Sequence, residues 1–258
     1  MNMIKELYNT VKIEMLKYKR TYALALAVLA PLFISSLFTI IYFCKAEKLV
    51  KAGVNGLNGV LDGSIGSTST LLFTFFIILL TVLIHQVEHK AHALKDLFSY
   101  PVSYFSTYSS KWIVSFMLLG LSILLYVAFS LFGVWILTIK HPTLFWFDSA
   151  RVLFFIKQVG VVTIASLLLM GIQFLIALKW SNVIVPFGVG IVGFISAVIL
   201  MQGWKYVHFH PYALSALSYH RTVGLSKVCL SQYLTFSSIG FIVLFIIGYF
   251  MWSKRRIV

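Results

Sequence analysis

Six long apolar runs divide the chain. They cover residues 22–43, 70–87, 112–139, 158–178, 183–201 and 233–252, and short segments that carry most of the charged residues separate them. At a rise of about 1.5 Å per residue, each run reaches roughly the 30 Å thickness of the hydrocarbon core of a bilayer. The runs are continuously apolar and do not alternate as barrel strands do. The pattern therefore predicts an all-α polytopic membrane protein with six transmembrane helices.

A helical stripe precedes the first run. Six apolar residues share an arc of about 100° at helical spacing, and they are Ile4, Leu7, Tyr8, Val11, Met15 and Tyr18. Lys5, Lys12 and Lys19 lie outside that arc. This pattern favours an amphipathic helix over residues 1–20 at the cytoplasmic membrane surface, with an extension of the first transmembrane helix as the alternative. Residues 21–258 then form a single six-helix transmembrane domain.

Composition excludes a soluble protein. Hydrophobic residues make up 60% of the 258 residues and charged residues only 11%, against about 25% charged residues in soluble domains. The net charge is +14, but the basic residues lie in short segments between apolar runs, where they face anionic lipid rather than nucleic acid. Two cysteines, Cys44 and Cys229, exclude a disulfide scaffold. Both are expected at the outer membrane boundary as free thiols, with a disulfide between them as the alternative.

The distribution of Lys and Arg predicts the orientation. Twelve of them lie in the N-terminal segment, the second and fourth loops and the C-terminal tail, eight lie on the other side, and Lys157 stands at the entrance of the fourth run. The positive-inside rule then places both termini in the cytoplasm and the protein in the plasma (inner) membrane. Residues 203–232 are expected to form an outer re-entrant or interfacial segment.

The spacing Gly188-x-Gly190-x-x-Gly193 matches the dinucleotide-binding fingerprint. That fingerprint requires a preceding strand and an acidic residue about 20 positions later. Here it lies inside an apolar run, and no Asp or Glu follows Asp148. We therefore interpret the three glycines as helix-packing positions.

Histidines form two patterns that resemble metal sites. His85-x-x-Glu88-His89 matches the inverted zinc-protease signature and places both imidazoles on one helix face. No acidic third ligand follows at the required position, so we interpret these residues as polar groups where a helix leaves the bilayer. Three more histidines stand among aromatic residues in the outer segment and are interpreted as interfacial rather than as metal or haem ligands; they are His208, His210 and His220.

Two absences narrow the function. No GxxxxGK[ST] motif occurs, so this chain carries no P-loop ATPase. No carboxylate lies within the six runs, which argues against a carrier driven by protons, because such carriers use buried carboxylates as relays. We predict no cofactor, metal or catalytic residue in this chain.

The polar loop 88–111 is the most informative segment between runs. Its first half predicts an amphipathic helix that ends before Pro101, since the residue before a proline avoids the helical region. Ser103 is expected to cap the next helix. A solvated loop with chance amphipathicity is the alternative. The residues of this segment that bear on the comparison below are Glu88, Lys90, Ala91, Leu94, Lys95, Leu97, Phe98 and Pro101.

In its layout and in this loop, the chain resembles the permease subunits of type-2 ABC (ABC-2) exporters. The layout of six spans is similar, and so is Leu97-Phe-Ser-Tyr-Pro-Val-Ser103, which corresponds to that family's Leu-x-Ser-x-Pro-x-Ser. The family commonly has Gly-Lys next, whereas Ser110 precedes Lys111 here. Smaller members include permeases for bacteriocin or lantibiotic self-immunity, a subgroup to which this chain is also similar.

The resemblance implies a permease without ATPase activity of its own. It implies pairing with a second copy or a paralogue. It also implies two separate ABC ATPase subunits, which bind ATP and dock on the helix at 88–99 through the residues named above. The expected cargo is amphipathic, peptide or lipid-like. Two other classes stay open: a membrane-embedded zinc enzyme that uses His85, Glu88 and His89, and a membrane scaffold subunit that does not transport.

The predicted topology is testable by cysteine labelling. A membrane-impermeant thiol reagent added outside the cell should modify a cysteine placed at Ser64 but not one placed at Ser99, because residues 53–67 are predicted to face outward. Labelling at position 99 but not at position 64 would show that the topology is the reverse of the predicted one.

Overall fold

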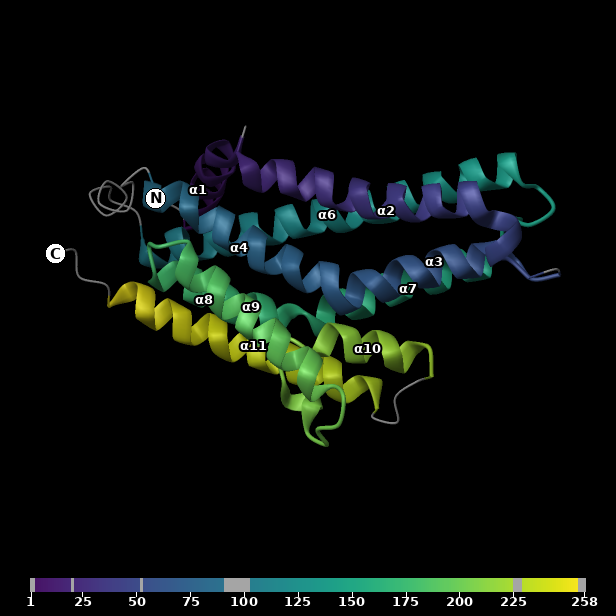
Figure 1. Ribbon diagram of the computed structural model, residues 1–258. Helices are drawn as coiled ribbons and strands as arrows, with labels where there is room; N and C mark the ends of the chain where they lie inside the picture. The colour runs from purple at the N-terminus through teal and green to yellow at the C-terminus, as the bar shows by residue number, and fades with distance from the viewer. Residues whose placement is uncertain (1–2, 20, 52, 91–102, 225–228, 255–258) are drawn as a thin grey trace.

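Helices make up all of the regular structure in the described part of the chain. The computed structural model describes residues 3–19, 21–51, 53–90, 103–224 and 229–254, with the side chains of residues 88–90 left out. The elements (Figure 1) are α1 (Met3–Tyr18), α2 (Tyr22–Leu49), α3 (Gly56–Ser67), the π-helix η1 (Thr68–Leu72), α4 (Phe73–Lys90), α6 (Tyr104–Lys140), α7 (Ser149–Ala165), α8 (Leu167–Lys179), α9 (Ile184–Leu200), the 3-10 turn η2 (Val207–Phe209), α10 (Leu214–Thr222) and α11 (Leu230–Ser253).

The long helices run along the molecule between two ends. Both termini lie at the same end, which we call the terminal end; α1, the end of α4, the start of α6 and the end of α11 form it (Figure 1). The opposite, distal end holds the start of α3, the end of α6 and the start of α7. Two hydrogen bonds join the distal elements. Gly56 N–H donates to the Leu144 carbonyl at 2.9 Å, and the Asn55 side-chain amide donates to the Trp146 carbonyl at 2.8 Å.

Helices α2 and α6 form the most extensive contact between two helices. A Cβ added to Gly133 of α6 would lie 2.0 Å from Thr39 Oγ1 of α2, so the glycine permits the approach. One turn away, Ser35 Oγ lies 3.1 Å from Ser130 Oγ and donates to the Tyr126 carbonyl at 3.4 Å. Small and hydroxyl residues of this kind let helix backbones approach closely in a bilayer, where the hydrophobic effect does not drive helices together.

A proline inside α2 is compensated from α6. Pro31 has no N–H, so the carbonyl of Ala27 loses its usual helical donor. The hydroxyl of Ser122 donates to that carbonyl at 2.9 Å. Since an unpaired backbone carbonyl in an apolar surrounding costs several kcal/mol, Ser122 both satisfies α2 and fixes its register against α6.

Helices α3 and α4 with η1 make one bent helix. Gly56–Val87 has the length and hydropathy of a membrane span, so the helix begins well before the predicted run at 70–87. Residues 56–67, which lie between two predicted runs, are therefore helical, and the prediction that residues 53–67 face outward stays a prediction. The Asn55 side chain caps the helix by accepting from Leu57 N–H at 3.0 Å, and Leu57, Leu61 and Ile65 are buried on one face.

This extension changes two further expectations. Asp62 lies inside the Gly56–Val87 helix, so a carboxylate is present within a candidate span, where Arg151 pairs with it. Ser64 is only 2% exposed, and its Oγ lies 2.6 Å from the Tyr126 hydroxyl oxygen. A cysteine at position 64 would therefore be shielded, and Val54, which is exposed, is the better position for the labelling experiment.

Among the described helices, four are long and apolar enough to span a membrane. They are α2, Gly56–Val87, α6 and α11, and the bent pair α7–α8, with 42° between its halves, is a fifth. Helix α9 covers the predicted run at 183–201 with 17 residues, or about 25 Å. A helix therefore overlaps each of the six predicted runs, while length and composition identify four to five spans, so the count of six stays a prediction.

The α2–α6 contact predicts a large asymmetry between two glycines of α6. Gly133→Leu should lower the free energy of unfolding by about 1–3 kcal/mol, because the new side chain would overlap Thr39. Gly120→Leu is the matched control, since an added Cβ there meets nothing within 4 Å. Thermal unfolding in detergent measures both variants, and equal midpoints for the two would contradict the close approach.

Candidate coupling end and apolar chamber

A buried ion pair joins α1 to α6 at the terminal end. Glu14 and Lys111 each have 1% of the side chain exposed, and Glu14 Oε1 lies 3.5 Å from Lys111 Nζ. Lys17 Nζ approaches the same oxygen at 2.9 Å, and Lys111 Nζ stands 5.5 Å from the centre of the Trp252 ring. Breaking a buried ion pair by removing one partner typically costs about 3–5 kcal/mol.

Helix α1 also binds the two chain segments that flank residues 91–102. Ser103, the N-cap of α6, donates its backbone N–H to Glu6 Oε1 at 2.6 Å. The Tyr18 hydroxyl donates to the Ile84 carbonyl of α4 at 3.3 Å. The hydrogen bond from the Ser103 backbone lowers the pKa of the Glu6 carboxyl, which therefore accepts as a carboxylate at neutral pH. One short helix thus connects both flanks of this segment.

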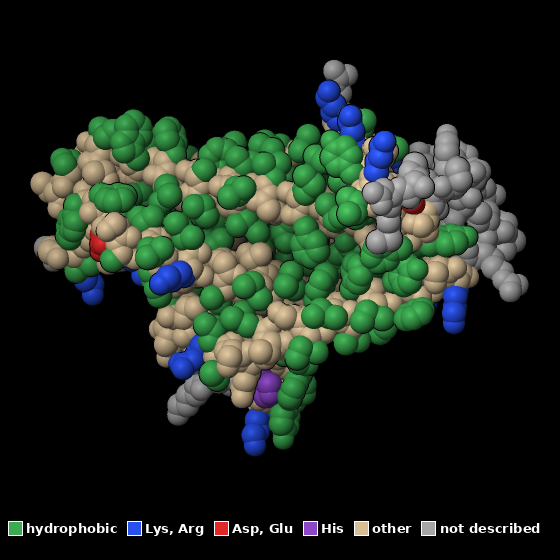
Figure 2. All heavy atoms as spheres, turned by 180° about the vertical axis from the view of Figure 1, so that it is seen from behind, with side chains coloured by type: hydrophobic (Ala, Val, Ile, Leu, Met, Phe, Trp, Pro, Cys, Tyr) green, Lys and Arg blue, Asp and Glu red, His purple; other side chains and the backbone are tan. Residues whose placement is uncertain are grey.

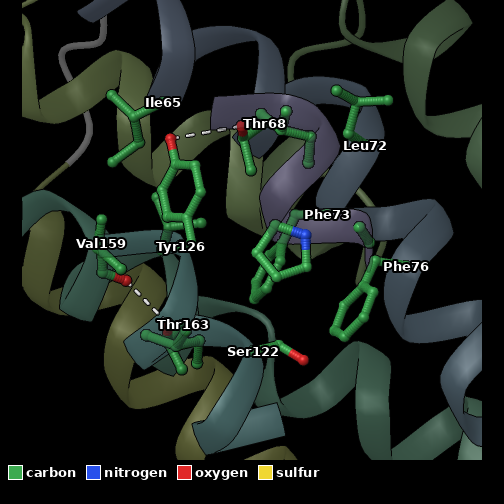
Figure 3. A pocket seen from close by; sticks show the side chains of 14 residues that line it. Ile65, Thr68, Leu72, Phe73, Phe76, Ser122, Tyr126, Val159 and Thr163 are labelled. Atoms are coloured by element: carbon green, nitrogen blue, oxygen red, sulfur yellow. Dashed lines mark hydrogen bonds between the residues drawn. The ribbon is translucent and has the colours of Figure 1, made fainter. Parts of the chain in front are cut away.

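An apolar chamber lies among α2, the bent helix, α6 and α7. Its cavity measures about 50 Å³, inside a hollow of about 500 Å³ that includes its open side. Lining residues include Ala30, Ile65, Phe73, Phe76 and Val159. Figure 3 shows Tyr126 on one side of the chamber, with its hydroxyl turned toward Thr68, and Phe73 and Phe76 on the other side.

Each hydroxyl in the chamber wall already has a partner within the chain. Ser122 donates to the Ala27 carbonyl at 2.9 Å, and Thr163 donates to the Val159 carbonyl at 2.8 Å. Thr68 donates to the Ser64 carbonyl at 2.7 Å. The Tyr126 hydroxyl is bonded to Ser64, as described above. The chamber therefore offers hydrocarbon surface rather than free donors to an occupant.

A second groove, which includes one carboxylate in its lining, lies near the distal end on the other side of η1. It measures about 580 Å³ and is lined by residues of α3, η1 and α10, among them Asp62, Thr70, Tyr219 and His220. The Tyr219 hydroxyl donates to the Asp62 carbonyl at 3.0 Å. Burial lowers the pKa of His220, which is therefore neutral at pH 7. Leu72 lines both hollows, so the π-helix forms the wall between them.

Comparison with known protein families assigns the chain to one of them. The sequence model described as "ABC-2 family transporter protein" matches residues 10–197, which is more than half of the chain. The chain belongs to the ABC-2 transporter family. The predicted family is confirmed, and this ABC-2 protein is a multi-pass membrane protein of a transporter. No curated protein matches it, and the bacteriocin-immunity subgroup stays a prediction.

Most of the predicted coupling interface of this ABC-2 protein lies outside the described residues. Glu88 and Lys90 belong to the last turn of α4 by their backbone. The remaining residues fall in the undescribed segment 91–102, and they are Ala91, Leu94, Lys95, Leu97, Phe98 and Pro101. The amphipathic helix at 88–99 therefore stays a prediction, and what the structure shows is how its two flanks are held.

The three predicted packing glycines differ in their surroundings. An added Cβ at Gly190 would lie 2.6 Å from Ile78 and 2.8 Å from the Gln173 amide, and one at Gly193 would lie 2.6 Å from the Tyr212 ring. An added Cβ at Gly188 would meet nothing within 4 Å. Close packing within the described chain thus explains why a glycine stands at two of the positions but not at Gly188.

The described histidines and cysteines do not form a candidate metal site. Among the residues that the structure describes, no three His, Cys, Asp or Glu side chains are grouped to hold a metal ion. His85 is buried, with Nδ1 2.8 Å from the Thr81 carbonyl, and His210 Nε2 lies 3.1 Å from Ser196 Oγ. Glu88 and His89 have undescribed side chains, so the zinc alternative stays a hypothesis. Cys44 and Cys229 are exposed free thiols.

Sequence reasoning missed the Glu14–Lys111 pair. The stripe on α1 predicts which residues face the membrane, and Ile4, Tyr8 and Met15 are indeed exposed, whereas Tyr18 is buried. It does not predict that Glu14 turns into the protein. A usable signal was present, because Glu14 is one of only two acidic residues before the first run and Lys111 closes the loop motif.

The buried pair predicts strong coupling between residues 14 and 111. Glu14→Gln removes the carboxylate that Lys111 and Lys17 share and should lower the free energy of unfolding by about 3–5 kcal/mol, whereas Lys111→Met should cost less, because Lys17 still pairs with Glu14. The double variant should lose less stability than the sum of the two single variants. Glu47→Gln, at an exposed glutamate of α2, is the matched control. Unfolding of the parent and the four variants in detergent tests this, and additive losses in the double variant would contradict a paired arrangement.

Proposed function

We propose that this protein is the transmembrane permease subunit of an ATP-driven exporter. Membership of the ABC-2 family implies partnership with ABC ATPase subunits in general. The observation that carries the specific proposal is the attachment of α1 to both flanks of residues 91–102, at Ile84 of α4 and at Ser103. A third contact of α1, from Glu14 to Lys111, lies about two helical turns after Ser103 on α6. In this arrangement, an ATPase that pushes on the segment also moves α1, α4 and α6 together.

The chamber wall includes parts of the helices that such a movement would shift. Helix α4 continues through η1 into the chamber wall, and α6 contributes Ser122 and Tyr126 to the same wall. Packed helices change between discrete arrangements rather than deforming continuously. We infer that docking and ATP-driven closure of the ATPases at 88–99 shift α4 and α6 together against α7, whose residues Val159 and Thr163 also line the chamber, and thereby reshape the chamber and the groove beyond η1.

The two hollows support an amphipathic, peptide or lipid-like cargo. An apolar chamber and a groove that Asp62, Thr70 and His220 line lie on opposite sides of one π-helix. A substrate with apolar and polar parts would find a surface for each along this route. The proposal includes cytoplasmic termini, export across the plasma membrane and a second permease copy or paralogue, with ATP bound by the partner chains.

Substitutions on the predicted coupling helix test the proposal. Leu94→Asp or Phe98→Asp should reduce ATPase association by about a hundredfold or more, because an unpaired charge would enter an apolar docking groove at a cost of several kcal/mol. Membrane insertion should survive, since these residues lie outside the apolar runs. The measurement is co-purification of the co-expressed ATPase subunit, with the expression level of each variant beside it.

Lys90→Ala and Asp96→Ala are the controls on the same segment. Charges at the rim of an interface mainly change encounter rates, so these two variants should retain most of the association. If both aspartate variants capture the ATPase as well as the parent does, residues 88–99 are not the docking element.

A further inference from the structure

The apolar chamber has an open side, and α2, which forms one of its walls, carries exposed apolar residues. On α2, the chamber-lining residues Ala30 and Ile34 alternate along the helix with Leu29 and Phe33, which are 59% and 61% exposed. The hollow around the cavity includes its open side. Figure 2 shows hydrophobic side chains along the length of the long helices on one face of the molecule. In a membrane, the medium that reaches this part of α2 is hydrocarbon.

Water is a poor occupant of the chamber. A buried water needs two to four polar partners, and the four wall hydroxyls, on Thr68, Ser122, Tyr126 and Thr163, already bond within the chain. The remaining wall is hydrocarbon. An occupant without polar groups is therefore favoured over water at this site.

The chamber has room for part of an acyl chain. Its cavity of about 50 Å³ is several times the roughly 10–15 Å³ that one water requires. The open side of the surrounding hollow lets the rest of a chain continue outward.

We propose that the chamber binds an acyl chain of a phospholipid from the surrounding bilayer. The chain enters beside α2 and contacts Phe73 and Tyr126 at its inner end. Transfer from bilayer hydrocarbon into the chamber gives no hydrophobic gain, so the binding comes from dispersion contacts that an empty cavity lacks. High affinity is not required, because acyl chains surround the site at high concentration. The proposal does not depend on the ATPase partnership.

A photoreactive phospholipid tests the site directly. The full-length protein is placed in vesicles of phosphatidylethanolamine and phosphatidylglycerol that contain a phospholipid with a diazirine near the end of one acyl chain. After irradiation, peptide mass spectrometry should find the label on chamber residues such as Phe73 or Tyr126. A phospholipid with the diazirine in its headgroup should leave these residues unlabelled.

Filling the chamber should remove the label. Ala30→Phe places a ring in the cavity and should reduce chamber labelling to the level found without irradiation. Ala25→Phe is the matched control, because it makes the same change on the same helix at an exposed position and should keep the label. Ile123→Phe, which fills the chamber from α6, replaces Ala30→Phe if that variant does not fold.

Three outcomes would overturn the proposal. The first is a parent protein whose chamber residues stay unlabelled by the acyl-chain probe. The second is undiminished labelling in a folded chamber-filling variant. The third is labelling by a diazirine fatty acid but not by the phospholipid, which would show that the occupant is not a bilayer lipid.

Discussion

Polar groups inside an apolar protein in a bilayer must find their partners within the chain, and most of this structure follows from that constraint. The carbonyl that Pro31 leaves free on α2 is satisfied by Ser122 of α6. Ser35 and Ser130 meet across the same contact. Each of these bonds exists in only one register of α2 against α6, so satisfying the polar groups also fixes how the two longest helices pack.

The same constraint explains the ion pairs Glu14–Lys111 and Asp62–Arg151. Lys111 lies near the start of α6, where Glu14 of α1 reaches it, and Arg151 at the start of α7 pairs with Asp62 of α3. Charged residues inside apolar helices are expensive and are found paired. One pair therefore holds the terminal end together and the other helps to hold the distal end, with the chamber between them.

The π-helix η1 links the structural and the functional arguments. It lies between the apolar chamber and the groove that Asp62 lines, and π-helical segments within longer helices frequently occur at functional sites. Thr68 of this segment faces the chamber, and Thr70 faces the groove. A change in the local winding of this short segment would alter both hollows together, and α4 connects it directly to the terminal end.

The sequence by itself determined the fold class, the family and the approximate position of each long helix, because continuous apolar runs and their flanking charges are local properties of the chain. The cap at Ser103 was predictable for the same reason. Tertiary structure alone decided that Asp62 belongs to a helix, that Glu14 meets Lys111 across 97 residues and that four helices leave a chamber. Such contacts depend on which register of packing satisfies buried polar groups at the least cost in free energy, and hydrophobic periodicity along one helix carries no record of the side chains that another helix presents to it.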